Sequence, residues 1–196
     1  MSNAVEGMRL VEEPRQPLSM NPKRFAMWLF LSTVVMLFAS LTSAYIVRQA
    51  EGNWLYFELP RLFYITSFVI IISSVTMQLA YFAAKAGNAE RLRFMITFTA
   101  VLGLVFLVGQ FMAWADLVGH SVHLVGNPSG SFLYILTGLH GLHIVSAVIF
   151  LLIVLNAAYR GKISPGKLLP IELCTTYWHF LGVLWLYLFI FLLLTR

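Results

Sequence analysis

The sequence predicts an all-α polytopic membrane protein that folds as one bundle of five transmembrane helices. Its 196 residues are 60% hydrophobic and only 11% charged, whereas a water-soluble domain usually carries about 25% charged residues. The mean hydropathy of +0.83 points the same way. The longest uncharged run extends from Leu117 to Tyr159 and exceeds the ~20 apolar residues that one span requires. That run must therefore contain one spanning helix and the loop before it.

The net charge and the cysteine content argue against a nucleic-acid partner and against an intrachain disulfide. The net charge is +5, but the basic residues lie in short segments between apolar runs, where membrane topology explains them better than a nucleic-acid partner does. Cys174 is the single cysteine, so an intrachain disulfide is impossible. We therefore expect an integral membrane protein without a nucleic-acid partner.

The chain begins with a polar segment and then enters the membrane. Residues 1–22 are predicted to form a flexible arm, because acidic and basic residues mix there with prolines and no apolar period appears. Residues 23–196 form the transmembrane domain. Its first helix is predicted over residues 25–47, an uncharged run between Arg24 and Arg48. The polar arm and the length of this run argue against a cleavable signal peptide.

Aromatic residues mark the end of the first span. Trp54 and Tyr56 follow it, and such side chains are enriched where a membrane meets water.

The second helix is predicted over residues 62–84. The third is predicted over residues 94–115, with Asp116 at its end.

The last two helices are separated from their neighbours by turn residues. Asn127 to Gly130 provide turn chemistry before a fourth helix predicted over residues 131–159. A basic loop broken by Pro165 and Gly166 follows, and the fifth helix is predicted over residues 172–195. An odd number of spans places the two termini on opposite sides of the membrane.

The distribution of basic residues predicts which side of the membrane is cytoplasmic. Loops that stay in the cytoplasm carry an excess of Lys and Arg. With five spans, three basic residues fall on one side: Arg48, Arg61 and Arg196. Ten fall on the side of the N-terminus: Arg9, Arg15, Lys23, Arg24, Lys85, Arg91, Arg93, Arg160, Lys162 and Lys167. We predict a cytoplasmic N-terminus and a periplasmic C-terminus.

Three histidines lie in the apolar centres of the last two predicted helices. His140 and His143 share one helix face, and Gly138 and Gly141 share an adjacent one. The glycines should let another backbone come close. His179, on the fifth helix, is predicted at a similar depth. Polar groups are expensive inside lipid, so we expect all three imidazoles to face other helices.

Two interpretations of these histidines compete at this point. His143 and His179, one from each helix, could clamp a haem iron in a small haem b protein. Alternatively, the imidazoles form hydrogen bonds across helices and hold the bundle together. His120 and His123, in the predicted outer loop, are weak evidence for a metal, because no Cys or pair of carboxylates accompanies them.

Two motifs and several single residues resemble a known family. Thr137–His143 read Thr-Gly-Leu-His-Gly-Leu-His, Tyr177–Phe180 read Tyr-Trp-His-Phe, and Trp185 follows six residues after the second motif's histidine. In order and spacing these closely resemble subunit III of haem-copper cytochrome c oxidase, over roughly residues 22–189. A five-helix bacterial form of that family is known, and this chain looks like it. The other matching residues are Met27–Leu31, Ala44, Tyr45, Gln110 and Trp114.

The resemblance implies a non-catalytic chain within a respiratory oxidase of the bacterial cytoplasmic membrane. Subunit III holds neither haem nor copper, which reside in subunits I and II. It packs mainly on subunit I, with subunits II and IV as further partners, binds phospholipid, and supports proton uptake and stability. Residues 41–48 look most like versions from the Bacteroidetes group, which implies one more partner, a quinol-oxidising complex in a supercomplex. A quinol oxidase subunit III is the alternative that shares this fold.

The sequence departs from the family at three acidic positions. Val34 stands where the first of these helices usually has Glu, Ala113 where the third often has Glu, and Gly182 where the last has Asp. Acids inside a membrane are usually functional. Their joint absence indicates that one set of polar interactions has been lost from this chain.

The candidate site residues are therefore structural or lipid-binding, and no catalytic or metal-ligating residue is predicted. The predicted polar contacts between helices involve His140, His143, His179, Trp178 and Gln110. The predicted lipid-headgroup contacts are Arg24, Arg91 and Arg93 on the inner side, and Trp54 and Tyr56 on the outer side.

Overall fold

The computed structural model describes residues 21–195, which form five helices and no strand. Each helix is long and apolar enough to cross a membrane, as the sequence predicted. The predicted arm lies outside the described residues except for its last two. The helices are α1 (Pro22–Ala50), α2 (Arg61–Lys85), α3 (Ala89–Gly119), α4 (Pro128–Tyr159) and α5 (Leu169–Thr195).

The helices begin and end further out than the uncharged runs that predicted them. α3 starts at Ala89 rather than at residue 94, so Arg91 and Arg93 belong to its first turns. Charged residues mark the edge of the hydrocarbon, but they do not end a helix. Asn21, Asn88 and Asn127 mark the true starts of α1, α3 and α4. Each asparagine side chain accepts a hydrogen bond from a backbone N–H of the first turn, at 3.0 Å.

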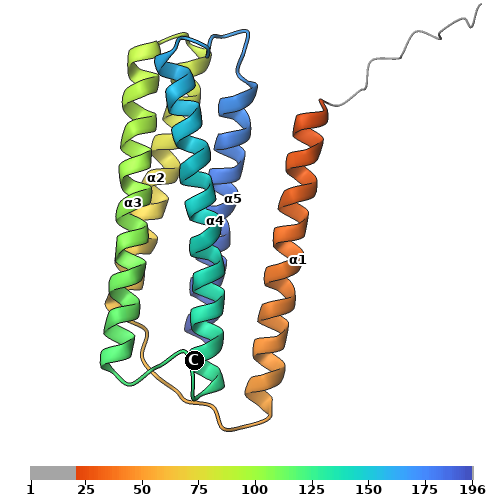
Figure 1. Ribbon diagram of the computed structural model, residues 1–196, viewed down its shortest axis with the longest axis vertical. Helices are drawn as coiled ribbons and strands as arrows, with labels where there is room; N and C mark the ends of the chain where they lie inside the picture. Colours follow the sequence, from red (N-terminus) through yellow and green to blue (C-terminus); the bar gives the residue numbers. More distant parts are fainter. Residues whose placement is uncertain (1–20, 196) are drawn as a thin grey trace, which may run out of the picture.

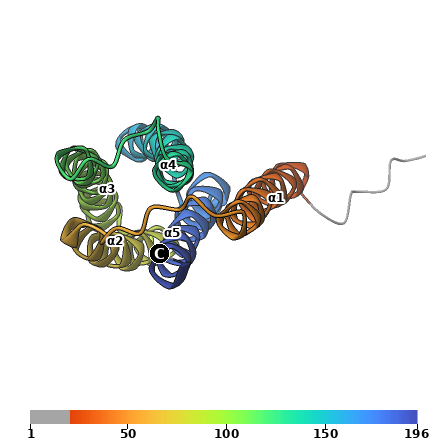
Figure 2. The ribbon, with the colours of Figure 1, turned by 90° about the horizontal axis from the view of Figure 1, so that it is seen from below.

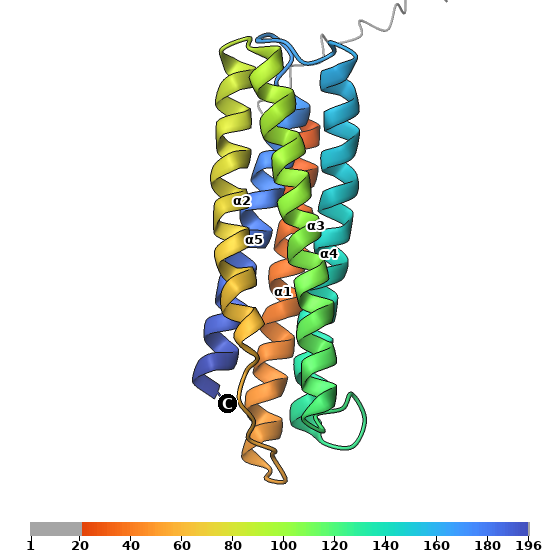
Figure 3. The same cartoon turned by 90° about the vertical axis from the view of Figure 1, so that its left-hand side faces the viewer.

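Four of the helices form a closed ring, and α1 stands outside it. Within the described chain α2 contacts α3 and α5, and α4 also contacts α3 and α5. α1 contacts only α4 and α5. Figure 2 shows this arrangement along the helix axes, with α1 next to α5 and away from α2 and α3. Figure 3 shows all five helices running nearly parallel to one long axis.

The interior of the ring is filled by large side chains. Trp178, Trp185, Phe63 and Phe106 each have at most 1% of their surface exposed. The indole of Trp185 meets the Phe63 and Phe106 rings edge to face, with centroids 5.7 and 5.1 Å apart. Large apolar side chains also cover the outside of the bundle, as expected for a surface that faces lipid.

The start of α1, the α2–α3 connection and the α4–α5 connection lie at one end of the molecule (Figure 1). The α1–α2 and α3–α4 connections lie at the other end, together with the end of α5. The described basic residues of the second end are Arg48 and Arg61. Those of the first end are Lys23, Arg24, Lys85, Arg91, Arg93, Arg160, Lys162 and Lys167. We call the first the basic end and the second the opposite end.

Three polar contacts attach α1 to α5 along its length. At the basic end Arg24 pairs with Glu172 at 2.7 Å. In the middle the hydroxyls of Thr42 and Tyr187 lie 3.1 Å apart. At the opposite end the Gln49 side-chain amide donates to the Thr195 carbonyl at 2.6 Å. These contacts fix α1 at both ends, although it lies outside the ring.

The Arg24–Glu172 ion pair should contribute little to stability. Its side chains are 51% and 32% exposed, and exposed ion pairs are typically worth ~0–1 kcal/mol. In a double-mutant cycle of Arg24→Gln and Glu172→Gln, followed by thermal unfolding in detergent, we expect a coupling energy below about 1 kcal/mol. A coupling above about 2 kcal/mol would mean that water does not screen this pair.

Candidate functional site

A row of hydroxyls on α2 accepts hydrogen bonds from the two buried tryptophans of α5. The indole N–H of Trp178 donates to the Ser73 hydroxyl at 2.9 Å, and that of Trp185 donates to the Ser67 hydroxyl at 2.9 Å. Trp178 was predicted as a polar contact between helices, whereas neither serine was among the predicted contacts. The two tryptophans are seven residues apart and the two serines six. This similar spacing could have predicted the pairs, but only if α2 had been known to pack on α5.

Other hydroxyls of α2 connect this helix to α3. The Gln110 side-chain amide donates to the Thr66 hydroxyl at 3.1 Å. The Thr76 and Thr99 hydroxyls lie 2.8 Å apart. Gln110 was predicted as a polar contact between helices, and its partner is on α2. α2 therefore links the third and fifth spans through hydroxyl groups.

His140 lies at the centre of the bundle, among aromatic rings. It has no exposed surface, and its ring centroid lies 5.3 Å from that of Trp185, 6.1 Å from Phe106 and 6.4 Å from Phe38. Within residues 21–195 neither ring nitrogen has a hydrogen-bond partner. We expected a polar contact here. The imidazole instead packs as an aromatic ring between α1, α3 and α5.

Replacing His140 with Leu should therefore leave the free energy of unfolding unchanged or raise it by up to about 2 kcal/mol, because a buried polar group without a partner carries a desolvation penalty of ~1–3 kcal/mol. His179→Leu is the matched control. It removes a ring with two hydrogen bonds and should destabilise by at least about 1 kcal/mol. Thermal unfolding in detergent measures both. Equal losses would show that the His140 nitrogens have partners.

His143 and His179 face different helices. His143 Nδ1 donates to the Leu139 carbonyl of its own helix at 2.7 Å, and its ring packs on Phe38 of α1. His179 lies against α2, where Nδ1 is 2.6 Å from the Ser74 hydroxyl and Nε2 is 3.0 Å from the Gln78 side-chain oxygen. Both nitrogens of His179 are thus already engaged. This geometry does not fit a haem clamped between the two rings.

The two histidines near the α3–α4 connection do not have the surroundings of a metal site among the described residues. The side chain of His120 is 75% exposed, and its Nδ1 bonds to the Asp116 carbonyl at 2.9 Å. His123 is exposed in the following loop. Across residues 21–195 no three His, Cys, Asp or Glu side chains lie close enough together to hold a metal ion.

The glycines predicted to admit a neighbouring backbone do not do so. A Cβ atom on Gly138 would meet only the Trp114 ring, at 3.6 Å, and one on Gly141 would meet nothing within 4 Å. Close packing occurs on α3 instead. A Cβ on Gly103 would lie 2.7 Å from the Trp178 ring, and one on Gly109 would overlap the Thr66 methyl group. Spacing shows that glycines share a face but not which helix that face meets.

The three positions without the family's acids all point into the protein. Val34 is 3% exposed and Ala113 is fully buried. Gly182 faces α2, where a Cβ atom would lie 3.6 Å from the Ser74 hydroxyl oxygen. The surroundings of Gly182 are polar although it has no side chain itself, because Ser74 lies beside it and also contacts His179.

The predicted headgroup residues at the basic end are partly engaged with protein. Arg93 stacks over the Tyr159 ring at 5.2 Å and donates to the Ala158 carbonyl at 3.2 Å. Arg24 is paired with Glu172. Arg91 is exposed and lines a hollow of about 580 Å³ together with Arg93 and Tyr159.

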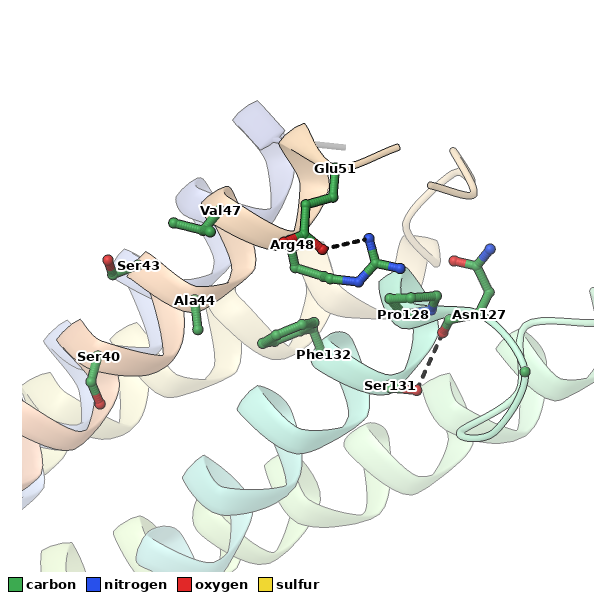
Figure 4. Close-up of a pocket in the computed structure, with 11 residues that line it drawn as sticks. Ser40, Ser43, Ala44, Val47, Arg48, Glu51, Asn127, Pro128, Ser131 and Phe132 are labelled. Carbon is green, nitrogen blue, oxygen red and sulfur yellow. Dashed lines mark hydrogen bonds and ion pairs between the residues drawn. The ribbon is translucent and has the colours of Figure 1, made fainter. Parts of the chain in front are cut away.

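At the opposite end the two predicted aromatic residues differ. The Trp54 ring packs on Tyr45, with centroids 4.7 Å apart, whereas Tyr56 is 69% exposed. A crevice of about 800 Å³ separates the ends of α1 and α4 there. Figure 4 shows Arg48 reaching across this crevice from α1 toward Pro128, with Glu51 at 3.3 Å from its guanidinium. Arg48 was not among the headgroup contacts predicted from the sequence.

Comparison with known proteins identifies the family. Residues 55–195 match the family Cytochrome c oxidase subunit III. Cytochrome c oxidase subunit 3 of Corynebacterium diphtheriae is 33% identical over 169 residues, which cover 82% of each chain. A probable cytochrome c oxidase subunit 3 of Mycobacterium bovis is 32% identical over 82% of this chain and 81% of its own. A probable quinol oxidase subunit 3 of Staphylococcus saprophyticus is 29% identical over 86% and 87%. The resemblance of the His and Trp motifs is confirmed: the chain belongs to the cytochrome c oxidase subunit III family.

Proposed function

We propose that this chain is the non-catalytic core subunit III of a respiratory haem-copper cytochrome c oxidase in a bacterial cytoplasmic membrane. The whole complex would reduce oxygen to water and pump protons, while this chain packs on subunit I, contacts subunits II and IV, and supports proton uptake. Its N-terminus would lie in the cytoplasm, because the basic residues of the described helices gather at that end.

The observation that supports a non-catalytic role most is where the polar side chains of α5 point. Trp178, Trp185 and His179 all bond to side chains of α2. These groups connect helices and do not converge on a common space that a substrate or cofactor would enter. We propose that haem and copper reside in subunits I and II.

Phospholipid binding forms a second part of the proposal. The hollow beside Arg91 and Arg93 and the crevice beside Arg48 lie at opposite ends of the bundle. Each combines at least one guanidinium with an aromatic ring, Tyr159 in the first and Phe132 in the second. Arginine suits a phosphate, and an aromatic ring suits the interfacial layer. We propose one headgroup site in each leaflet.

Mild purification of the native complex through a tag on this chain tests the main proposal. We expect the catalytic oxidase subunits to co-purify, with all haem assigned to them. A pyridine haemochrome spectrum of the isolated chain should show no haem band. Stoichiometric haem b in the isolated chain would contradict the proposal. The same preparation would reveal a quinol-oxidising complex if the oxidase is part of a supercomplex.

A quinol oxidase subunit III is the second candidate, and the Staphylococcus saprophyticus relative favours it, since its name is that of a quinol oxidase subunit. The two candidates differ in the electron donor and not in the fold of this chain. The co-purified subunit II decides between them. A dinuclear copper centre there means cytochrome c as donor, and its absence means quinol.

A further inference from the structure

A small groove between α2 and α5 exposes polar groups on the outside of the bundle. It has a volume of about 290 Å³, and its lining includes Ser74, Gln78, His179 and Gly182. Val75 and Val183 form its rim and are 56% and 66% exposed. The groove therefore opens away from the ring interior and toward whatever surrounds the bundle.

The polar groups of the groove form a chain with a fixed direction. The Gln78 side-chain oxygen can only accept, so His179 Nε2 must carry the proton and donate to it at 3.0 Å. Nδ1 then accepts from the Ser74 hydroxyl at 2.6 Å. The Gln78 amide nitrogen remains, and within residues 21–195 its two N–H groups donate to no other group. Among the described residues, the groove thus holds no partner for these two N–H donors.

These unused donors lie inside the hydrocarbon, away from the headgroups. His179 is seven residues past Glu172 of α5 and Gln78 is seven residues before Lys85 of α2, so both lie ~10 Å along the helix axis from a charged residue of the basic end. The whole hydrocarbon core is ~30 Å thick. Phospholipid headgroups do not reach that depth, and acyl chains offer no acceptor. Polar groups at such a depth normally face another helix, so a protein partner fits the groove better than a lipid.

Gly182 gives the groove the shape of a helix-packing site. It is buried against α2 beside Ser74, and small residues of this kind let two transmembrane helices come close. The exposed valines on either side supply apolar contacts. Position 182 itself carries no side chain, so it leaves space in the groove that it lines.

We propose that a transmembrane helix of oxidase subunit I packs into the α2–α5 groove and places a hydrogen-bond acceptor, such as a hydroxyl or a carboxyl oxygen, on the Gln78 amide. This inference rests on the proposed function, since it takes its partner from the oxidase. It adds the face of this chain that docks and the chemistry that the partner helix must offer.

Photo-crosslinking in the assembled complex tests the docking face. A benzophenone amino acid is placed at Val75, Val183 or, as the matched control, Val108 on α3. Val108 is 58% exposed and lies on α3, which contributes no residue to the groove lining. We expect the two rim positions to form an adduct with subunit I and Val108 to form none. Adducts with lipid only, with a second copy of this chain, or at Val108 alone would overturn the inference.

A blocking substitution gives an independent measurement. Gly182→Leu fills the groove, while its Cβ makes only ordinary contacts with Ser74 and Ile70, so the bundle should still fold. In a pull-down of the tagged chain, we expect Gly182→Leu to bind subunit I about 3- to 10-fold more weakly than the wild type, which is the loss that corresponds to one interhelical hydrogen bond. Gly141→Leu, which meets open space, should retain wild-type binding. Equal retention of both variants would contradict the inference. If wild-type chain purifies without any oxidase, the proposed function fails instead.

Discussion

Replacing Trp178 with Ala is expected to lower the free energy of unfolding by about 3–5 kcal/mol, the range for truncating a large buried aromatic side chain. Trp178 is 1% exposed and packs against Gly103 of α3. Its indole also donates to Ser73 of α2. One truncation therefore opens a cavity between three helices and removes a hydrogen bond. Thermal unfolding of the detergent-solubilised chain, followed by circular dichroism, measures the loss.

Trp28 provides the matched control for this prediction. It is 60% exposed on α1, where a lipid or detergent chain can replace its contacts. Trp28→Ala should therefore change stability by no more than about 0.5 kcal/mol. If both alanine variants unfold at the same temperature, Trp178 does not pack in the interior as described.

The packing and hydrogen-bonding parts of the Trp178 effect can be separated. Trp178→Phe keeps most of the ring but loses the N–H, and should cost about 1–2 kcal/mol. Ser73→Ala removes the acceptor from the other side. In a double-mutant cycle the two substitutions should couple by about 1 kcal/mol. A coupling near zero would mean that the indole and the hydroxyl do not interact.

The number of helices followed from the sequence because lipid imposes a simple requirement. Runs without charge must be long enough to cross the hydrocarbon, and each such run is a helix in the structure. The helix ends were less predictable. Arg91 and Arg93 mark the membrane edge in the sequence, yet the backbone continues as helix through them because the Asn88 cap lies before them. The asparagine caps were present in the sequence and would have given better boundaries.

The side-chain pairings could not be predicted, because they depend on how each helix is rotated about its axis. His143 and His179 were placed at a similar depth from residue counts. The structure turns the first toward Phe38 of α1 and the second toward Ser74 of α2. Residue spacing within one helix defines a face, but neighbouring helices decide what that face meets. The same limit explains why Gly141 was expected to pack closely and instead meets open space.

Two glycine substitutions of identical chemistry should change stability in opposite directions. Gly103→Ala places a Cβ atom 2.7 Å from the Trp178 ring and 3.3 Å from a Val148 methyl carbon. The ring cannot move aside freely, because it is buried and held by its hydrogen bond to Ser73. Overpacking of this kind typically costs ~1–3 kcal/mol. Gly141→Ala meets no atom within 4 Å, and should instead stabilise α4 by up to about 1 kcal/mol through its better helix propensity.

A Trp178→Phe background identifies the source of the Gly103 effect. The phenyl ring lacks the far edge of the indole, which is the part that the new Cβ atom would strike. Gly103→Ala should therefore cost less in this background than in the wild type, whereas Gly141→Ala should have the same effect in both. Thermal unfolding of the four glycine variants and of their two parents, the wild type and Trp178→Phe, in one detergent provides the comparison. If Gly103→Ala were stabilising in the wild type, α3 and α5 would have to lie further apart than the packing of Trp178 on Gly103 allows.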